Sequence, residues 1–144
     1  MHILEWGVKE SFRAYFERLP DHNYALSGGS KMLIDGRFQF PGLSADAQCL
    51  QFHGEIRMTG HHGALSLQIA DPIIEFHNAD TAMLSAVVDE ENAQPYRLVI
   101  AALSKKSEDA HSIIFDTHLA NDGQFLFMGN YFAGDPMDPV TIRK

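Results

Sequence analysis

Apolar and polar residues alternate along the stretch Leu50-Gln51-Phe52-His53-Gly54-Glu55-Ile56-Arg57-Met58-Thr59. Successive side chains of a β-strand point to opposite faces, so this period of two predicts one strand with a buried and a solvated face. A second alternating stretch, from Leu65 to Ile69, follows the turn Gly60-His61-His62-Gly63. The centre of the chain therefore predicts β structure.

Short apolar runs separated by turn residues occupy the chain on both sides of this centre. Asp35-Gly36 between two such runs is a strong hairpin signal, because a tight turn needs positive φ. We expect a break at Asp71-Pro72, since the residue before Pro avoids the helical region. Further strands are expected at 24–26, 31–34, 37–40, 73–76, 83–88, 96–103, 112–119 and 124–127, and a buried helix is the alternative for 96–103. Loops are expected at 43–47, 89–95 and 104–110 (the last alternatively a short helical turn), with an irregular tail from 135 onwards.

Regularly spaced short strands of this kind predict a mainly β protein with a small helical part. The expected architecture is an antiparallel β-sandwich or barrel-like sheet with an N-terminal helix packed on it. With no internal repeat or linker, residues 1–144 are expected to form a single domain.

The expected N-terminal helix begins at Trp6 and is stopped by Pro20, which cannot donate a backbone hydrogen bond. It carries Ser11 and Tyr15 one turn apart on one face, because a helix repeats every ~3.6 residues. Phe12 and Phe16 are among the apolar residues that would dock it. A hydroxyl and a phenol in this arrangement are either packing residues or the wall of a ligand pocket.

Composition excludes several classes of protein. The net charge of −8 argues against a nucleic-acid partner. No apolar stretch reaches the ~18 residues that a membrane span needs. The first residues lack the basic and apolar regions of a signal peptide, so with Met1 as the native start we expect a cytoplasmic protein. Cys49 is the only cysteine, which excludes an internal disulfide framework and a thiolate metal cluster within one chain.

The sequence also lacks the common catalytic motifs. There is no Gly-x-Ser-x-Gly, no Gly-x-Gly-x-x-Gly and no metal-binding His-x-x-x-His helix among the eight histidines. What remains is Tyr15, the glycine-flanked His61-His62 turn and the glycine-flanked Tyr131. Taken alone, each of these also fits a packing or turn residue.

Three separated motifs resemble those of the HtaA domain family, the haem-binding module of actinobacterial haem-uptake proteins. The first is Trp6-Gly7-Val8-Lys9-Glu10-Ser11-Phe12-Arg13-x-Tyr15. The second is Gly60-His61-His62-Gly63 followed by Ala64-Leu65-x-Leu67-x-Ile69-x-Asp71-Pro72. The third is Tyr131-x-Ala133-Gly134-x-x-x-Asp138-Pro139-Val140. They occur in the family's order across nearly the whole chain.

The resemblance implies a non-enzymatic protein that holds haem b, in the ferric state, for uptake, transfer or storage. It implies that Tyr15 is the iron ligand and that His61 hydrogen-bonds it, a role that the neighbouring His62 could also fill. Ser11 and Tyr131 are implied to hold the haem propionates. Family members are typically secreted or located at the cell surface, so another haem-binding protein is implied as donor or acceptor. The sequence leaves a homodimer open.

The chemistry of the residues agrees with this expectation. Tyr is one of the side chains that ligate haem iron, and ferric iron favours the phenolate of a group whose pKa is ordinarily about 10. Phe12 and Phe16 are expected to cover the ring, and Arg13 or Lys9 to meet the carboxylates at the rim. Two alternatives stay open: a Tyr-ligated haem enzyme of the catalase or peroxidase kind, and a β-rich carrier of another apolar ligand.

Overall fold

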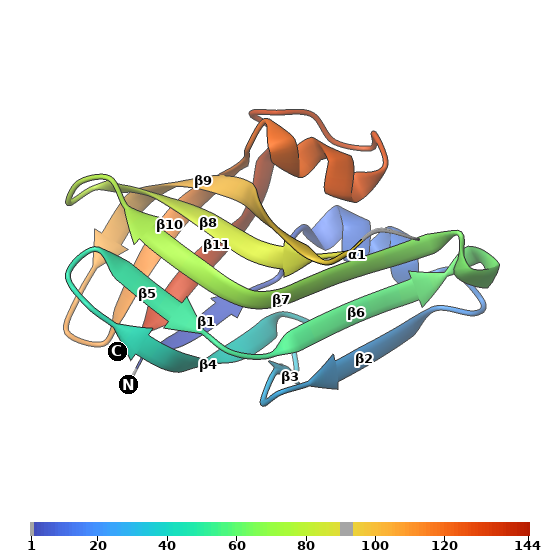
Figure 1. The fold of residues 1–144 in the computed structure, drawn as a ribbon, viewed down its shortest axis with the longest axis horizontal. Coiled ribbons are helices and arrows are strands. Elements are labelled where there is room, and N and C mark those ends of the chain that lie inside the picture. The colour runs from blue at the N-terminus through green and yellow to red at the C-terminus, as the bar shows by residue number, and fades with distance from the viewer. Residues whose placement is uncertain (1, 90–93) are drawn as a thin grey trace.

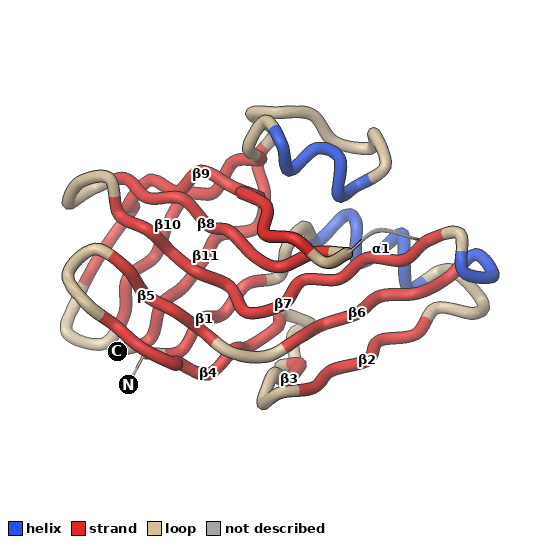
Figure 2. The backbone as a smooth tube through the Cα atoms, in the orientation of Figure 1, coloured by secondary structure: helices blue, strands red, loops and turns tan. Residues whose placement is uncertain are grey.

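The computed structural model describes residues 2–89 and 94–144, and strands dominate this part of the chain (Figure 2). In chain order the elements are β1 (Ile3–Trp6), α1 (Glu10–Glu17), β2 (Asn23–Ser27), β3 (Lys31–Met32), β4 (Phe38–Ala45), β5 (Cys49–Phe52), β6 (Glu55–Gly60), the 3₁₀ helix η1 (His61–Gly63), β7 (Leu65–Phe76), β8 (Thr81–Val88), β9 (Tyr96–Glu108), β10 (Ser112–Leu119), the 3₁₀ helix η2 (Asp122–Phe127) and β11 (Pro136–Arg143).

Eight of the strands close into an antiparallel barrel. The ring runs β7-β5-β4-β1-β11-β10-β9-β8, and β8 pairs back with β7. Beyond the first half of β7 the sheet continues through β6 to β2, while β3 pairs with β4. In Figure 1 this extension points to the right, the end at which α1 lies, and both chain ends lie at the left. The prediction of a mainly β, barrel-like sheet is confirmed.

The long strand β7 joins the barrel to the extension because its two halves pair with different strands. Residues 65–70 pair with β6, and residues 73–75 pair with β5. Between them Asp71 has φ of 47°, and its carboxylate accepts a hydrogen bond from the backbone N–H of Gly54 at 3.1 Å. The prediction that a strand ends at Asp71-Pro72 is therefore wrong. These residues form an irregularity inside one continuous strand.

The alternating stretch 50–59 forms two strands, so the expected single strand is wrong. The chain leaves β5 after Phe52 and enters β6 at Glu55. Gly54 lies between them with φ of 121°, a conformation that favours glycine. Leu50, Phe52, Ile56 and Met58 are nevertheless all buried. The alternation shows which side chains are buried, but it does not show where one strand ends, because the same face is buried before and after Gly54.

The N-terminal helix is shorter than expected. Residues Ile3–Trp6 form β1, which lies between β4 and β11 in the barrel, and the helix starts only at Glu10. It ends at Glu17, before Pro20. Trp6 is buried through strand pairing rather than through a helical face, which the sequence pattern could not distinguish.

Several other boundaries differ from the sequence expectations. The expected loop at 43–47 is strand β4 as far as Ala45, and that at 104–110 is strand β9 as far as Glu108. The expected strand at 124–127 belongs to the 3₁₀ helix η2, and the tail forms β11. Cross-strand pairing extends β4, β9 and β11 through polar or Pro-containing sequence. Of the expected loop at 89–95, residues 90–93 lie outside the described part.

The core fills the barrel and continues beneath α1. The helix buries Phe12 and Phe16, which confirms the expectation of a helix packed on the sheet. Residues 120–135, which follow β10, are here called the η2 segment. They fold over the outside of the barrel on the side away from the chain ends (Figure 1). Phe127 fixes the segment through a fully buried ring. Gly123 lies so close to the backbone of Ile100 that no side chain would fit there.

Candidate functional site

Helix α1 presents one polar face to the outside. Phe12 and Phe16 lie four residues apart and point into the core, which directs Ser11 and Tyr15 away from it. The Tyr15 side chain remains accessible, with 38% of the residue exposed. A phenol is therefore displayed on a helix whose other face is fixed by packing.

The Tyr15 hydroxyl meets a histidine from the opposite side of the site. Tyr15 Oη lies 2.8 Å from Nε2 of His61, which is the first residue of η1. The turn that carries His61 is unusual, because His61, His62 and Gly63 have φ of 50°, 53° and 91°. Left-handed backbone costs roughly 1–2 kcal/mol for an ordinary residue, so this turn needs support from its surroundings.

That support comes from Asp21, in the connection between α1 and β2. Its Oδ2 accepts the backbone N–H of His62 at 2.7 Å, and its Oδ1 accepts that of His61 at 3.1 Å. These N–H groups, with His62 the larger contributor, hold the pKa of Asp21 below its usual range. The carboxylate therefore stabilises the strained turn.

A second contact, between two hydroxyl groups, lies one helical turn earlier on the polar face. Ser11 Oγ lies 2.7 Å from Tyr131 Oη, which comes from the η2 segment. The Tyr131 ring packs edge-on against Phe127 and Phe12, with ring centroids 5.6 and 6.4 Å apart. Tyr131 is thereby held over the helix.

A cleft lies between α1 and the η2 segment. It has a volume of 290 Å³ and is lined by Phe12, Tyr15, Asn130 and Tyr131. A second cavity, of 170 Å³, lies against the start of β7 and β9 and includes Phe125 and Met128 of the η2 segment in its lining. Phe125, Met128 and Phe132 are all exposed by more than half, at 69%, 54% and 65%. The η2 segment thus carries three exposed apolar side chains.

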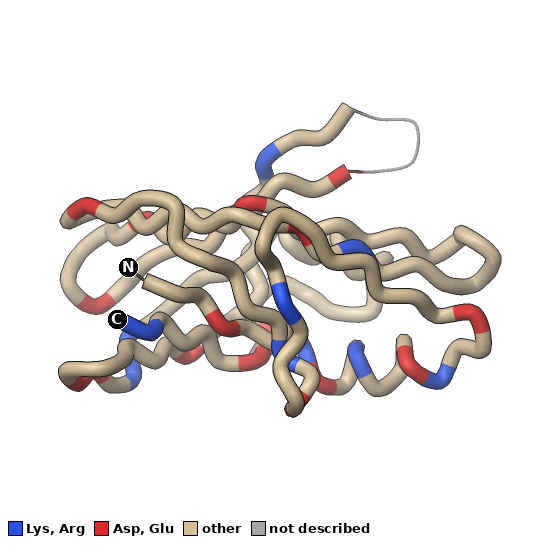
Figure 3. Tube along the Cα trace, turned by 90° about the horizontal axis from the view of Figure 1, so that it is seen from below, with Lys and Arg blue, Asp and Glu red and all other residues tan. Residues whose placement is uncertain are grey.

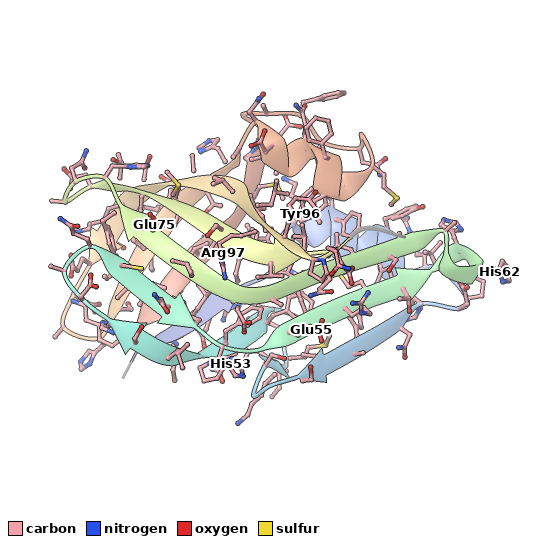
Figure 4. The ribbon with its side chains drawn as sticks, in the orientation of Figure 1. His53, Glu55, His62, Glu75, Tyr96 and Arg97 are labelled. Atoms are coloured by element: carbon pink, nitrogen blue, oxygen red, sulfur yellow. The ribbon has the colours of Figure 1, made fainter. Side chains whose placement is uncertain are left out.

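The structure brings together most of the residues singled out from the sequence. Tyr15 pairs with His61, Ser11 pairs with Tyr131, and Phe12 lines the cleft. The other two lie apart from it. Phe16 is fully buried against Tyr24 and His22. The His62 side chain is 98% exposed and points outward from the end of the extension (Figure 4).

The two basic residues expected at the rim have different environments. Lys and Arg residues are interspersed with Asp and Glu along the described chain (Figure 3), so individual side chains determine the charge near the cleft. Lys9 Nζ lies 5.9 Å from the centroid of the Tyr131 ring and donates to the carbonyl of Pro136. Arg13 instead lies against Asp138 and the Gly7 carbonyl, with only 11% of its side chain exposed. Lys9 is the better placed of the two.

Sequence reasoning missed Asp21 and Asn130. Neither residue belongs to a motif or to a pattern that indicates a site. No residue spacing connects Asp21 with a histidine forty residues later, so only the fold could show this contact. Within the described residues, no three His, Cys, Asp or Glu side chains cluster as metal ligands. No helix in residues 2–89 and 94–144 is long and apolar enough to cross a membrane.

Comparison with known proteins supplies the remaining observation. A family model described as Htaa matches residues 2–143. The solved C-terminal domain of HtaA from Corynebacterium glutamicum is 26% identical, with a TM-score of 0.80 over 99% of this chain and 94% of that chain. The N-terminal domain of the same protein is 22% identical, with a TM-score of 0.78 over 99% and 96% of the two chains. The heme binding protein HtaB from that organism is 16% identical, with a TM-score of 0.79 over 98% and 90%. A search of curated proteins finds no match.

Proposed function

The chain belongs to the HtaA family, and on this premise we propose that it binds ferric haem b with the phenolate of Tyr15 as the iron ligand. In this proposal residues 1–144 act as one non-enzymatic haem-binding unit that serves uptake, transfer or storage, with another haem-binding protein as donor or acceptor. The observation that carries the proposal is the exposed Tyr15 hydroxyl, 2.8 Å from His61 Nε2 at the wall of the cleft.

The surroundings of Tyr15 suit a phenol that must lose its proton. Its hydroxyl faces an imidazole nitrogen, which accepts a hydrogen bond from the phenol when that nitrogen carries no proton. Once protonated, His61 Nε2 donates a hydrogen bond back to the phenolate and keeps the ring oriented. Bound ferric haem supplies the positive charge that favours the phenolate. Tyr15 Oη and His61 Nε2 therefore hold one proton in a hydrogen bond between two defined atoms.

Tyr24, on the other side of α1, shows the contrast. Its hydroxyl donates to Glu17 at 3.0 Å. Burial, followed by this hydrogen bond to a carboxylate, raises the pKa of Tyr24 above its usual value. Tyr24 therefore keeps its proton, whereas Tyr15 faces a group that can accept one.

The rest of the cleft fits a flat apolar ring that carries carboxylates. Phe12 supplies apolar surface, and the Ser11 and Tyr131 hydroxyls can turn their protons towards an acceptor. Lys9 adds a positive charge beside Tyr131. A carrier of another apolar ligand would have no need for a phenol in the wall of its pocket.

The test is a hemin titration followed by absorption on the wild type, Tyr15→Phe and Tyr24→Phe. We expect a saturable high-spin ferric spectrum in the wild type and in Tyr24→Phe, and its loss in Tyr15→Phe. Each variant removes one phenol hydroxyl and nothing else, Tyr15 from helix α1 and Tyr24 from a ring packed against it, so the two substitutions are the same in size. An identical spectrum in Tyr15→Phe and the wild type would show that Tyr15 is not the ligand.

A further inference from the structure

The N-terminus of helix α1 depends on contacts from outside the helix. The helix contains only eight residues, and its N-cap residue Lys9 makes no side-chain capping hydrogen bond. Helices this short are unstable alone because nucleation is costly. The first N–H groups of a helix have no partner within it, so a partner must come from elsewhere.

The partner comes from β11, at the other end of the chain. Asp138 Oδ1 accepts the backbone N–H of Glu10 at 2.8 Å, and its Oδ2 accepts Arg13 Nη2 at 3.1 Å. The side chains of Arg13 and Asp138 are only 11% and 17% exposed, so solvent screens this pair less than a surface pair. One carboxylate thus caps the helix and pairs with a side chain one turn further along.

The backbone of Asp138 holds the approach to the helix as well. Its N–H donates to the carbonyl of Val8 at 3.0 Å, and its carbonyl accepts the indole N–H of Trp6 at 2.9 Å. Val8 has φ of 66°, which is a strained conformation for a β-branched residue. The connection from β1 to α1 is therefore held in an unfavourable conformation by contacts to β11, in which Asp138 donates its backbone N–H to Val8 and Pro136 accepts Lys9 Nζ.

Gly7 leaves the space that Asp138 needs. A Cβ at this position would overlap Asp138 Oδ2 and would come within 2.9 Å of Arg13 Nη2. A residue with a side chain at position 7 would consequently displace the carboxylate from the helix.

We propose that Asp138 is a positioning residue for the site: by capping α1 and pairing with Arg13, it fixes the rotation of the helix that brings Tyr15 to His61 and Ser11 to Tyr131. Contacts at residues 10 and 13 fix the start of the helix, and together with the buried rings of Phe12 and Phe16 they set its rotation about its own axis. Ser11 and Tyr15 each meet their partner within hydrogen-bond distance, and a small rotation would break both contacts. The functional part of this inference rests on the proposed function.

The experiment compares Asp138→Ala, Asp138→Asn and Gly7→Ala with the wild type. Asn can still cap a helix but cannot form an ion pair, so it separates the two contacts. Glu108→Gln is the matched control, because it removes a carboxylate that pairs with Lys105 and Lys144 at the other end of the barrel. Two quantities are measured: hydrogen exchange of the α1 and β7 amides in the haem-free protein, and the rate of hemin release to excess apoglobin.

We expect Asp138→Ala to speed both α1 exchange and hemin release about tenfold, and Asp138→Asn to speed them about threefold, as lost caps and ion pairs of ordinary strength would. Gly7→Ala should resemble Asp138→Ala although it keeps the carboxylate. Exchange in β7 should stay at the wild-type rate, as should both quantities in Glu108→Gln.

Two results would overturn the inference. One is wild-type exchange in α1 of Asp138→Ala; the other is exchange that rises equally in α1 and β7, which would make Asp138 a residue of general stability. A wild type that takes up no hemin would overturn the proposed function instead, because the exchange data still decide whether Asp138 positions the helix.

Discussion

Two neighbouring histidines on η1 have opposite environments. His61 Nε2 lies against the Tyr15 hydroxyl, whereas the His62 side chain is almost fully exposed and its ring lies 4.0 Å from Asp21. We predict that His61→Ala speeds hemin release about tenfold, as is usual when a group that orients a ligand is removed. His62→Ala should leave the rate unchanged. Release rates measured with apoglobin decide this, and a larger effect from His62 would reverse the assignment.

The carboxylate of Asp21 makes the η1 turn sensitive to acid. The pKa of Asp21 is lower in the folded protein than its usual 3.8, chiefly because its carboxylate accepts the backbone N–H of His62. Its contribution to stability is therefore fully present above about pH 4 and is lost as the pH falls through the lower, folded-state value.

We accordingly predict that the amide signals of His61 and His62 shift together as the pH falls below about 4. In Asp21→Asn this acid transition should be absent from both signals. A transition of the same midpoint in Asp21→Asn would assign it to another carboxylate.

The η2 segment depends on one buried ring. Phe127 is fully buried and packs edge-on against Phe12 at 5.3 Å and Tyr131 at 5.6 Å. Phe127→Ala should lower the free energy of unfolding by about 3–5 kcal/mol, the usual cost of emptying such a site. It should also weaken hemin retention, because Tyr131 loses its support.

Phe125→Ala, on the same 3₁₀ helix, is the matched control. That side chain is 69% exposed, so the expected change in unfolding free energy is within about 0.5 kcal/mol. Urea denaturation measures both variants. Equal losses for the two would mean that the segment is not fixed by Phe127.

The elements that sequence reasoning located correctly share a physical cause. Strand β10 was expected at 112–119 and is found at Ser112–Leu119, because its alternation coincides with one buried face and clear turns at both ends. For segment 124–127 the prediction of a strand is wrong, since a short apolar run also fits a 3₁₀ helix. Periodicity identifies a buried face, but it does not identify the partner that covers it.

The residues of the site were predictable from the sequence, but most of their contacts were not. Tyr15, His61, Ser11 and Tyr131 were named from motifs, and the fold brings them into two pairs. His62 belongs to the second motif and Phe16 to the apolar face of the expected helix, and both lie outside the cleft, because neither pattern states which way a side chain points. The contacts of Asp21 and Asp138 cross long stretches of chain, so no local pattern could reveal them.

At the scale of the whole molecule, the barrel is closed by strands from both ends of the chain. Strand β1 pairs with β11, and the only tryptophan, Trp6, is buried in β1 and donates to the carbonyl of Asp138. We predict that urea unfolding followed by Trp6 fluorescence and by far-ultraviolet circular dichroism gives coincident transitions, because β1 cannot leave without opening the ring. Fluorescence that changes at lower urea would show that β1 and α1 detach from an otherwise intact barrel.

The same pairing has a consequence for protein engineering. Ile3 faces Arg143 across β1 and β11, and the two ends lie together at the end of the barrel opposite α1 (Figure 1). A short peptide would join them into a ring, and a host protein could carry the whole barrel inside one of its surface loops through two adjacent attachment points. The cleft would then face away from the host. Such chimeras would serve as reporters whose optical signal depends on what occupies the cleft.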